Sequence, residues 1–90
     1  MEHVKGKKKA DIILFALSTC IWCRKTKSLL DELGVDYNYV YVDLAEGEER
    51  DLIKKEMQRW NPKMSFPTIV LNSSKCIVGF DEQGIRNGLK

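Results

Sequence analysis

The sequence predicts an α/β domain with the element order βαβαββα and a four-stranded mixed sheet flanked by helices. Three observations support this prediction. A continuous apolar run at 12–17 precedes a segment with helical spacing, a second β-type segment ends at residue 43, and two short β-type segments follow residue 65. A chain of 90 residues has room for one small domain. We assign residues 1–10 to a flexible lead-in and residues 11–90 to this domain.

The composition excludes several classes of protein. With 43% hydrophobic and 31% charged residues the chain is too apolar for disorder, and no apolar stretch approaches the ~18 residues of a membrane span. A formal charge of +2 does not favour nucleic-acid binding. The lysine run at 7–9 is not followed by an apolar core as long as that of a signal peptide. We therefore expect a cytoplasmic monomer with neither a nucleic-acid nor a membrane partner.

The first half of the chain predicts a strand, a helix and a second strand. The run at 12–17 is apolar on both faces, as in a covered strand. Helical offsets of three, four and seven then connect Thr26, Leu29, Leu30 and Leu33. Gly34 suits the end of this helix, and aromatic and β-branched residues alternate over 37–43. A strand–helix–strand unit of this length predicts two parallel strands with a right-handed crossover.

The second half predicts a helix, a hairpin and a short final helix. An apolar stripe at helical spacing is formed by Leu52, Ile53, Met57 and Trp60. Pro62 ends this helix. The segments 66–71 and 76–78 flank a polar cluster that suits a turn, so these strands should be antiparallel. Asp81 is a suitable N-cap for the last helix.

Two cysteines two residues apart mark the junction between the first strand and the first helix. Cys20-Ile21-Trp22-Cys23 in this context predicts a redox centre of the thioredoxin-like kind. Unpaired backbone N–H groups at the start of a helix stabilise a thiolate, so we predict that Cys20 is the nucleophile. The helix dipole usually contributes below ~1 kcal/mol. We therefore expect further help from the Trp22 and Cys23 amides and from a nearby cation of Arg24, Lys25 or Lys27.

Cys23 lies one helical turn further along and should be less exposed than Cys20. It fits the thiol that attacks a mixed disulfide on Cys20 and releases the reduced substrate. The predicted function is thus thiol–disulfide exchange, which needs no cofactor beyond the two sulfurs.

From Ile12 to its end the chain resembles a glutaredoxin, a dithiol member of the thioredoxin superfamily. Three motifs carry the resemblance: Phe-x-x-Ser-x-Cys-x-x-Cys at 15–23, Ser-Phe-Pro-Thr at 65–68 and Val-Gly-Phe-Asp at 78–81. The resemblance implies the thioredoxin fold and an enzyme that reduces protein disulfides or mixed disulfides through Cys20 and Cys23.

The resemblance also implies a binding site beside the two cysteines. Pro67 matches a cis proline that presents the preceding backbone to the substrate thiol, Gly79 matches a position where a ligand approaches closely, and Asp81 matches a position that holds the γ-glutamyl end of glutathione. The predicted substrate- and thiol-binding residues are Trp22, Phe66, Pro67, Gly79, Phe80 and Asp81.

Some positions depart from the family pattern. Ile21 replaces a proline, Val78 replaces a glycine, and Leu17 replaces a lysine that would attract a ligand carboxylate. Trp22 and the Gly-Phe turn at 79–80 are similar to glutaredoxin-like electron donors of ribonucleotide reductase, which thioredoxin reductase reduces, while the archaeal methanoredoxins use coenzyme M. The reductant is therefore left open between glutathione, coenzyme M and thioredoxin reductase.

Other readings of the same residues have to be weighed. In some glutaredoxins two subunits hold an iron–sulfur cluster through the position of Cys20 and two small thiols, which gives an alternative function. A zinc site would need Cys20, Cys23, Cys76 and His3, and we expect no bound metal. Cys76 is expected to pack as a small apolar side chain. Asp81 is suited both to capping the last helix and to contacting a ligand. Lys63, near the proline, is a further candidate for meeting a substrate carboxylate.

Overall fold

The computed structural model describes residues 1–89, so Lys90, the last residue of the predicted domain, lies outside it. The predicted βαβαββα order is present, with one further strand and a single 3₁₀ turn. In chain order the elements are β1 (Glu2–Val4), β2 (Ile12–Ala16), α1 (Ile21–Leu33), β3 (Tyr37–Tyr41), η1 (Val42–Leu44), α2 (Gly47–Trp60), β4 (Thr68–Leu71), β5 (Lys75–Val78) and α3 (Glu82–Gly88).

The strands form one mixed sheet in the order β1-β3-β2-β4-β5. Strand β2 pairs parallel with β3 and antiparallel with β4, and β4 pairs antiparallel with β5. The parallel pair and the antiparallel hairpin are both as predicted. In the hairpin turn Asn72 and Ser73 have φ values of 53° and 51°. Two successive positive φ values are typical of the turns that best match the twist of a hairpin.

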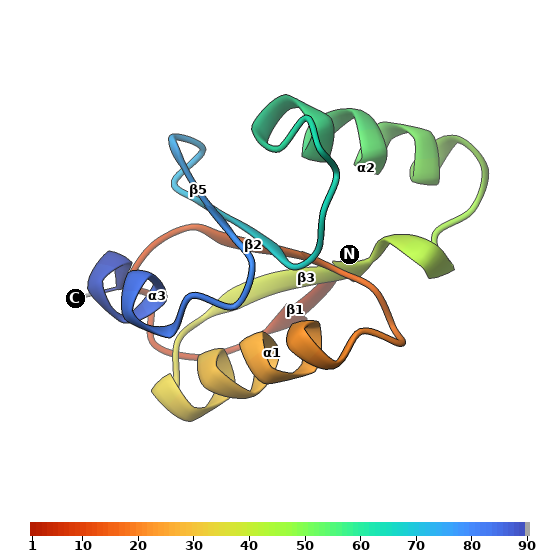
Figure 1. The fold of residues 1–90 in the computed structure, drawn as a ribbon. Helices are drawn as coiled ribbons and strands as arrows, with labels where there is room; N and C mark the ends of the chain where they lie inside the picture. Colours follow the sequence, from red (N-terminus) through yellow and green to blue (C-terminus); the bar gives the residue numbers. More distant parts are fainter. Residues whose placement is uncertain (90) are drawn as a thin grey trace.

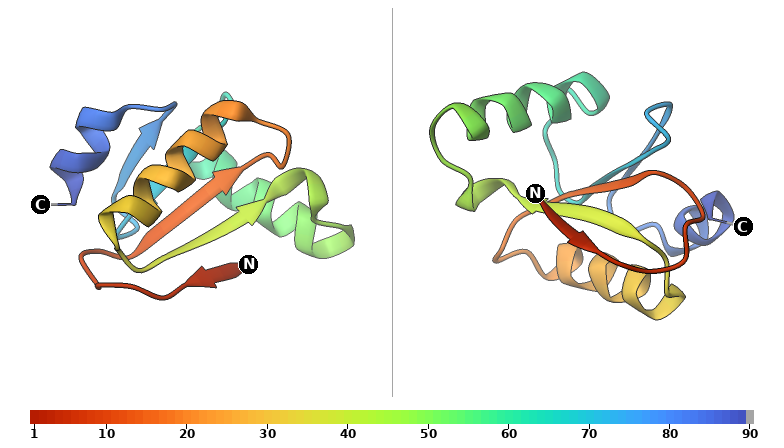
Figure 2. Two further views of the ribbon diagram at one scale, coloured as in Figure 1. Left: turned by 90° about the horizontal axis from the view of Figure 1, so that it is seen from below. Right: turned by 180° about the vertical axis from the view of Figure 1, so that it is seen from behind.

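The helices cover both faces of the sheet (Figures 1 and 2). On one face α1 and α3 bury an apolar cluster that includes Leu14, Leu30 and Ile85. On the other face α2 packs Ile53 and Met57 against residues that include Phe15, Val40 and Val70. Apolar side chains on both faces of β2 explain why its sequence is a continuous apolar run. The predicted α/β thioredoxin-like architecture is confirmed.

The predicted number of four strands is wrong, because the sheet formed by residues 1–89 has five. Residues 2–4 lie in the segment that we assigned to a flexible lead-in, yet they pair antiparallel with β3, with Glu2 opposite Tyr39 and Val4 opposite Tyr37. The Lys7 amide also donates to the Gly34 carbonyl at 2.8 Å. An edge strand gains its pairing from main-chain hydrogen bonds and often carries charged side chains, so its sequence need not alternate.

Candidate active site

Cys20 is the N-cap residue of α1, with extended backbone angles of φ −94° and ψ 118°. Its Sγ atom accepts a hydrogen bond from the backbone amide of Cys23 at 3.2 Å. The first turn of a helix has amides without intrahelical partners, and here one of them is directed at sulfur. The sulfur-bearing residue is partly exposed, as a nucleophile requires. Of the two amides expected to help, the structure brings the Cys23 amide onto the sulfur.

Cys23 lies one turn into α1 and is 1% exposed. Burial, followed by the hydrogen bond with Cys20, raises the pKa of the Cys23 thiol far above its ordinary value. The thiol form of Cys23 is therefore favoured while Cys20 faces solvent. This pair has the unequal exposure that the sequence predicted for an attacking and a resolving cysteine.

The loop before Cys20 is held by a residue that the sequence did not indicate. Asp43, in the 3₁₀ turn after β3, accepts a hydrogen bond from the Ser18 amide at 2.9 Å and another from the Ser18 hydroxyl. These bonds lower the pKa of the Asp43 carboxyl. A carboxylate that accepts two hydrogen bonds anchors the chain two residues before the sulfur.

The peptide bond between Phe66 and Pro67 is cis, as the family resemblance implied. Pro67 is buried, and Phe66 is half-buried against both apolar clusters. The Gly79 amide donates to the Pro67 carbonyl at 2.8 Å. This bond joins the end of β5 to the proline loop, so two of the three family motifs are in direct contact.

Gly79 has a φ of +81°, in the left-handed region that favours glycine. Its carbonyl accepts from the Asp81 amide at 3.1 Å. Asp81 then caps α3, because its Oδ1 atom accepts from the Gly84 amide at 2.9 Å. The predicted N-cap is confirmed, and the ligand contact of Asp81 stays a prediction.

Two aromatic rings form an exposed platform beside the cysteines. Trp22 is 53% exposed, and its ring stacks on Phe80 with centroids 6.1 Å apart. The Lys25 Nζ atom lies 4.7 Å from the centre of the Trp22 ring. Ile21 is also exposed, at 63%. An exposed apolar surface of this kind is a common feature of binding sites.

The predicted cations do not behave alike. Lys25 lies over Trp22, whereas Lys27 pairs with Asp31 at 3.3 Å. Lys27 also lies 5.0 Å from the centre of the Tyr39 ring, on the β3 side of α1. Lys27 therefore contributes to the packing of the helix on the sheet, whereas Lys25 lies at the aromatic platform and Arg24 lines a groove that includes Phe80.

Two grooves flank this site. One lies between α1 and the start of α3 and is lined by Ile21, Arg24, Lys25, Ser28, Leu29, Glu32, Phe80 and Glu82. The other lies on the α2 side, next to the proline loop, and is lined by Leu17, Val42, Asp43, Ala45, Arg50, Lys54, Met64 and Phe66. The second groove contains two cations from α2 close to Leu17, the position where the family has a lysine.

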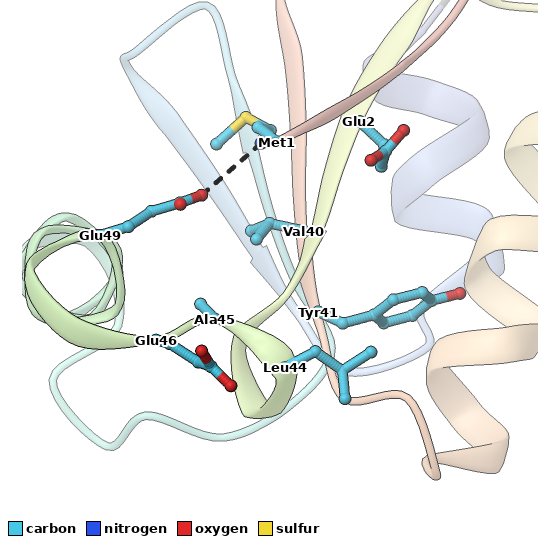
Figure 3. Close-up of a pocket in the computed structure, with 8 residues that line it drawn as sticks. All are labelled: Met1, Glu2, Val40, Tyr41, Leu44, Ala45, Glu46 and Glu49. Atoms are coloured by element: carbon cyan, nitrogen blue, oxygen red, sulfur yellow. Dashed lines mark ion pairs between the residues drawn. The ribbon is translucent and has the colours of Figure 1, made fainter.

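A third groove lies between β1, β3 and the start of α2 (Figure 3). It is lined by Met1, Glu2, Val40, Tyr41, Leu44, Ala45, Glu46 and Glu49. Its rim holds an ion pair of 3.9 Å between the Met1 amino group and Glu49. It contains none of the predicted site residues, so it is separate from the redox pair.

The four candidate zinc ligands do not meet. His3 is on β1 and bonds to Asp36 at 2.8 Å, whereas Cys76 is on β5 at the opposite edge of the sheet. Within residues 1–89 no group of three or more His, Cys, Asp or Glu side chains is placed to bind a metal ion. None of the helices in that range has the length and apolar character that a membrane crossing requires.

The sequence missed two polar residues that shape the site, Asp43 and Asn61. Asn61 is 5% exposed and bonds to the chain on both sides of Phe66 and Pro67. The nearest signal for Asp43 is its place in the turn that follows β3, a strand that runs parallel to β2. Asn61 precedes Pro62 at the end of a helix. An asparagine at this position suggests a helix cap, and the sequence gives no sign of its contacts with the proline loop.

A thioredoxin-like sheet with a cysteine pair at the start of α1 defines a class of dithiol redox proteins. The model of the glutaredoxin family matches residues 12–75, and the chain belongs to this family. Family and fold together support the function of a thiol–disulfide oxidoreductase.

Two solved structures and one protein sequence show the similarity. The methanoredoxin of Methanosarcina acetivorans is 52% identical, with a TM-score of 0.90 over 93% of this chain and 88% of that chain. A glutaredoxin of Methanosarcina mazei Go1 is 51% identical, with a TM-score of 0.92 over 98% of this chain and 85% of that chain. An uncharacterized glutaredoxin-like 8.6 kDa protein in the rubredoxin operon of Clostridium pasteurianum is 31% identical over 82% of this chain and 91% of that protein.

Proposed function

We propose that this protein is an enzyme that reduces protein disulfides or mixed disulfides by dithiol exchange. The observation that carries the proposal is the unequal pair of cysteines at the start of α1. Cys20 is partly exposed, and its sulfur accepts a hydrogen bond from the Cys23 amide. The Cys23 side chain is buried, and this burial raises its pKa. An exposed sulfur with an amide donor suits attack, and a buried thiol one helical turn away is placed for the second step, in which it acts after losing its proton.

The exchange has two steps. The Cys20 thiolate attacks one sulfur of a substrate disulfide, forms a mixed disulfide with it, and displaces the other sulfur as a thiolate. Cys23 then loses its proton and attacks the Cys20 sulfur, which releases the second substrate thiolate. The substrate gains two electrons, and its two thiolates take up the proton that Cys23 releases and one proton from water. Cys20 and Cys23 are left as a disulfide.

The substrate lies between the proline loop and the aromatic platform in this proposal. Neither the amide nor the carbonyl of Phe66 has a hydrogen-bond partner within residues 1–89, so both are available to an extended peptide. Trp22 and Phe80 supply the apolar surface, and Asp81, whose Oδ1 atom caps α3, presents its second oxygen to a ligand amine.

An external reductant must reopen the disulfide, and we infer a small thiol or thioredoxin reductase. For a small thiol with an anionic end, the groove on the α2 side offers Arg50 and Lys54 near Leu17. These two cations can take the role of the lysine that the family resemblance would place at position 17. They can attract the anionic end of glutathione as well as that of coenzyme M. We further infer a cytoplasmic location, where thiols are kept reduced.

Single cysteine variants test the proposal. Turnover of a model peptide disulfide is measured with dithiothreitol, glutathione, coenzyme M or thioredoxin reductase as the electron source. Cys20→Ser should abolish turnover above background, and Cys23→Ser should stop after one exchange and accumulate a mixed disulfide that mass spectrometry detects. Cys76→Ser is the matched control and should behave as the wild type.

Full turnover by the Cys20→Ser variant would contradict the proposal. A visible absorbance in anaerobically purified protein would favour the iron–sulfur alternative instead.

A further inference from the structure

Asn61 follows the last residue of α2 and is 5% exposed, although its side chain has two N–H donors and an acceptor. Its Nδ2 atom lies 3.2 Å from the Ser65 carbonyl, 3.1 Å from the Ser65 hydroxyl and 3.0 Å from the Thr68 hydroxyl. The Lys63 amide donates to its Oδ1 atom at 3.2 Å. A buried amide is costly unless it is bonded in this way.

The direction of this side chain is fixed by its backbone partners. The Ser65 carbonyl can only accept a hydrogen bond, and the Lys63 amide can only donate one. If the Asn61 nitrogen and oxygen exchanged places, the side-chain nitrogen would face the Lys63 amide, so that two donors met. The side-chain oxygen would face the Ser65 carbonyl, so that two acceptors met. The amide has one orientation in which both of these backbone contacts are favourable.

The bonds of Asn61 lie on both sides of the cis peptide unit. Ser65 precedes Phe66, and Thr68 follows Pro67. The Thr68 hydroxyl also donates to the Ser65 carbonyl at 2.8 Å, so the two flanking residues are joined to each other and to the end of α2. Phe66 keeps its backbone groups unpaired within residues 1–89, in a loop that is otherwise held on both sides.

We propose that Asn61 is a positioning residue for substrate binding. It holds Ser65 and Thr68 to the end of α2 and thereby sets the place of the Phe66 backbone, which pairs with the peptide beside a substrate disulfide. This inference rests on the proposed dithiol exchange and adds a residue that does not contact either sulfur. Loss of the amide should weaken substrate binding while Cys20 keeps its own reactivity.

The experiment compares two rates in the same variants. For Asn61→Ala, kcat/KM for a model peptide disulfide, with dithiothreitol as electron source, should fall about ten- to hundredfold through a higher KM. The rate at which iodoacetamide alkylates Cys20 should stay at the wild-type value, because alkylation does not use the proline loop.

A second pair of variants tests the same contact from its other end. Thr68→Val keeps the shape of the side chain and removes the hydroxyl that bonds to Asn61 and Ser65, so KM should rise. Thr68→Ser keeps the hydroxyl and should restore the wild-type KM. Tyr37→Phe is the stability control, since it removes a partly buried hydrogen bond to Asp31 at the far end of α1 and should leave KM unchanged.

The outcomes separate the two proposals. A wild-type KM in Asn61→Ala or in Thr68→Val, or a higher KM in Tyr37→Phe, would overturn the role of Asn61 and leave dithiol exchange intact. Equal losses of turnover and Cys20 alkylation in Asn61→Ala would also overturn it. A wild-type protein without turnover would overturn the proposed function itself, and the inference with it.

Discussion

The backbone amide of Cys23 donates a hydrogen bond to the Sγ atom of Cys20 at 3.2 Å, while the Cys23 side chain itself is buried. Cys23 thus contributes to the site in two ways. Its backbone amide stabilises negative charge on the Cys20 sulfur, and its own thiol lies in an apolar environment one helical turn away. The two sulfurs differ in exposure although they are three residues apart, and burial raises the pKa of the Cys23 thiol.

This difference predicts the order in which the cysteines are alkylated. In the reduced protein at neutral pH, iodoacetamide should modify Cys20 first, Cys76 slowly and Cys23 last. Burial raises the pKa of both Cys23 and Cys76, and Cys23 is the more deeply buried of the two. Peptide mass spectrometry over a time course measures the order. Cys76→Ala removes one competitor and should leave the order of the other two unchanged; equal rates at Cys20 and Cys23 would refute it.

The contact between Ser18 and Asp43 predicts a loss of stability in acid. The pKa of Asp43 is lowered below its ordinary value of 3.8, chiefly by the hydrogen bond from the Ser18 hydroxyl and then by the one from its amide. A carboxyl whose pKa is lowered on folding contributes stability above its unfolded pKa and loses it as the pH falls through the folded pKa. The free energy of unfolding of the wild type should therefore fall over the window just below pH 3.8.

Urea unfolding of the wild type and of Asp43→Asn as a function of pH measures this contribution. The wild type should be the more stable protein near neutral pH, and the difference should shrink as Asp43 is protonated. Asp51→Asn removes an exposed carboxylate of α2 that does not bond to the redox loop, so it serves as the control. A difference between wild type and Asp43→Asn that is the same at every pH would rule out this linkage.

Much of the site could be predicted from the sequence because its parts are local. The cysteine pair follows an apolar run and opens a segment with helical spacing, so the place of Cys20 at the start of α1 could be read from neighbouring residues. The proline and the glycine turn came from family motifs. Their direct contact, through the hydrogen bond from Gly79 to Pro67, fits the antiparallel hairpin that the sequence also predicts.

The parts that the sequence missed depend on residues that are distant or on the main chain. Asp43 bonds to a residue 25 positions earlier, and a polar residue after a strand has no pattern that names its partner. Asn61 stands where a helix ends, so its role depends on how the following loop folds back. Strand β1 pairs through backbone groups that every residue carries, and its polar residues Glu2 and His3 resemble those of a flexible terminus.

The strand that the sequence missed leads to a prediction about Gly6. A Cβ atom built at Gly6 would lie 2.6 Å from both the carbonyl carbon and the carbonyl oxygen of Val35, and the Gly6 amide donates to the Asp36 carboxylate at 3.0 Å. Gly6→Ala should therefore push the N-terminal segment away from β3 and destabilise the fold by about 1–3 kcal/mol, the usual cost of overpacking. Urea unfolding measures the loss, and amide hydrogen exchange should show faster exchange at Lys7.

Lys5→Ala, at an exposed neighbour, should change stability by less than about 0.5 kcal/mol. Turnover of a peptide disulfide should persist in the folded Gly6→Ala variant, because β1 is separated from β2 by β3. A variant as stable as the wild type would mean that the segment before β2 does not pack against Val35.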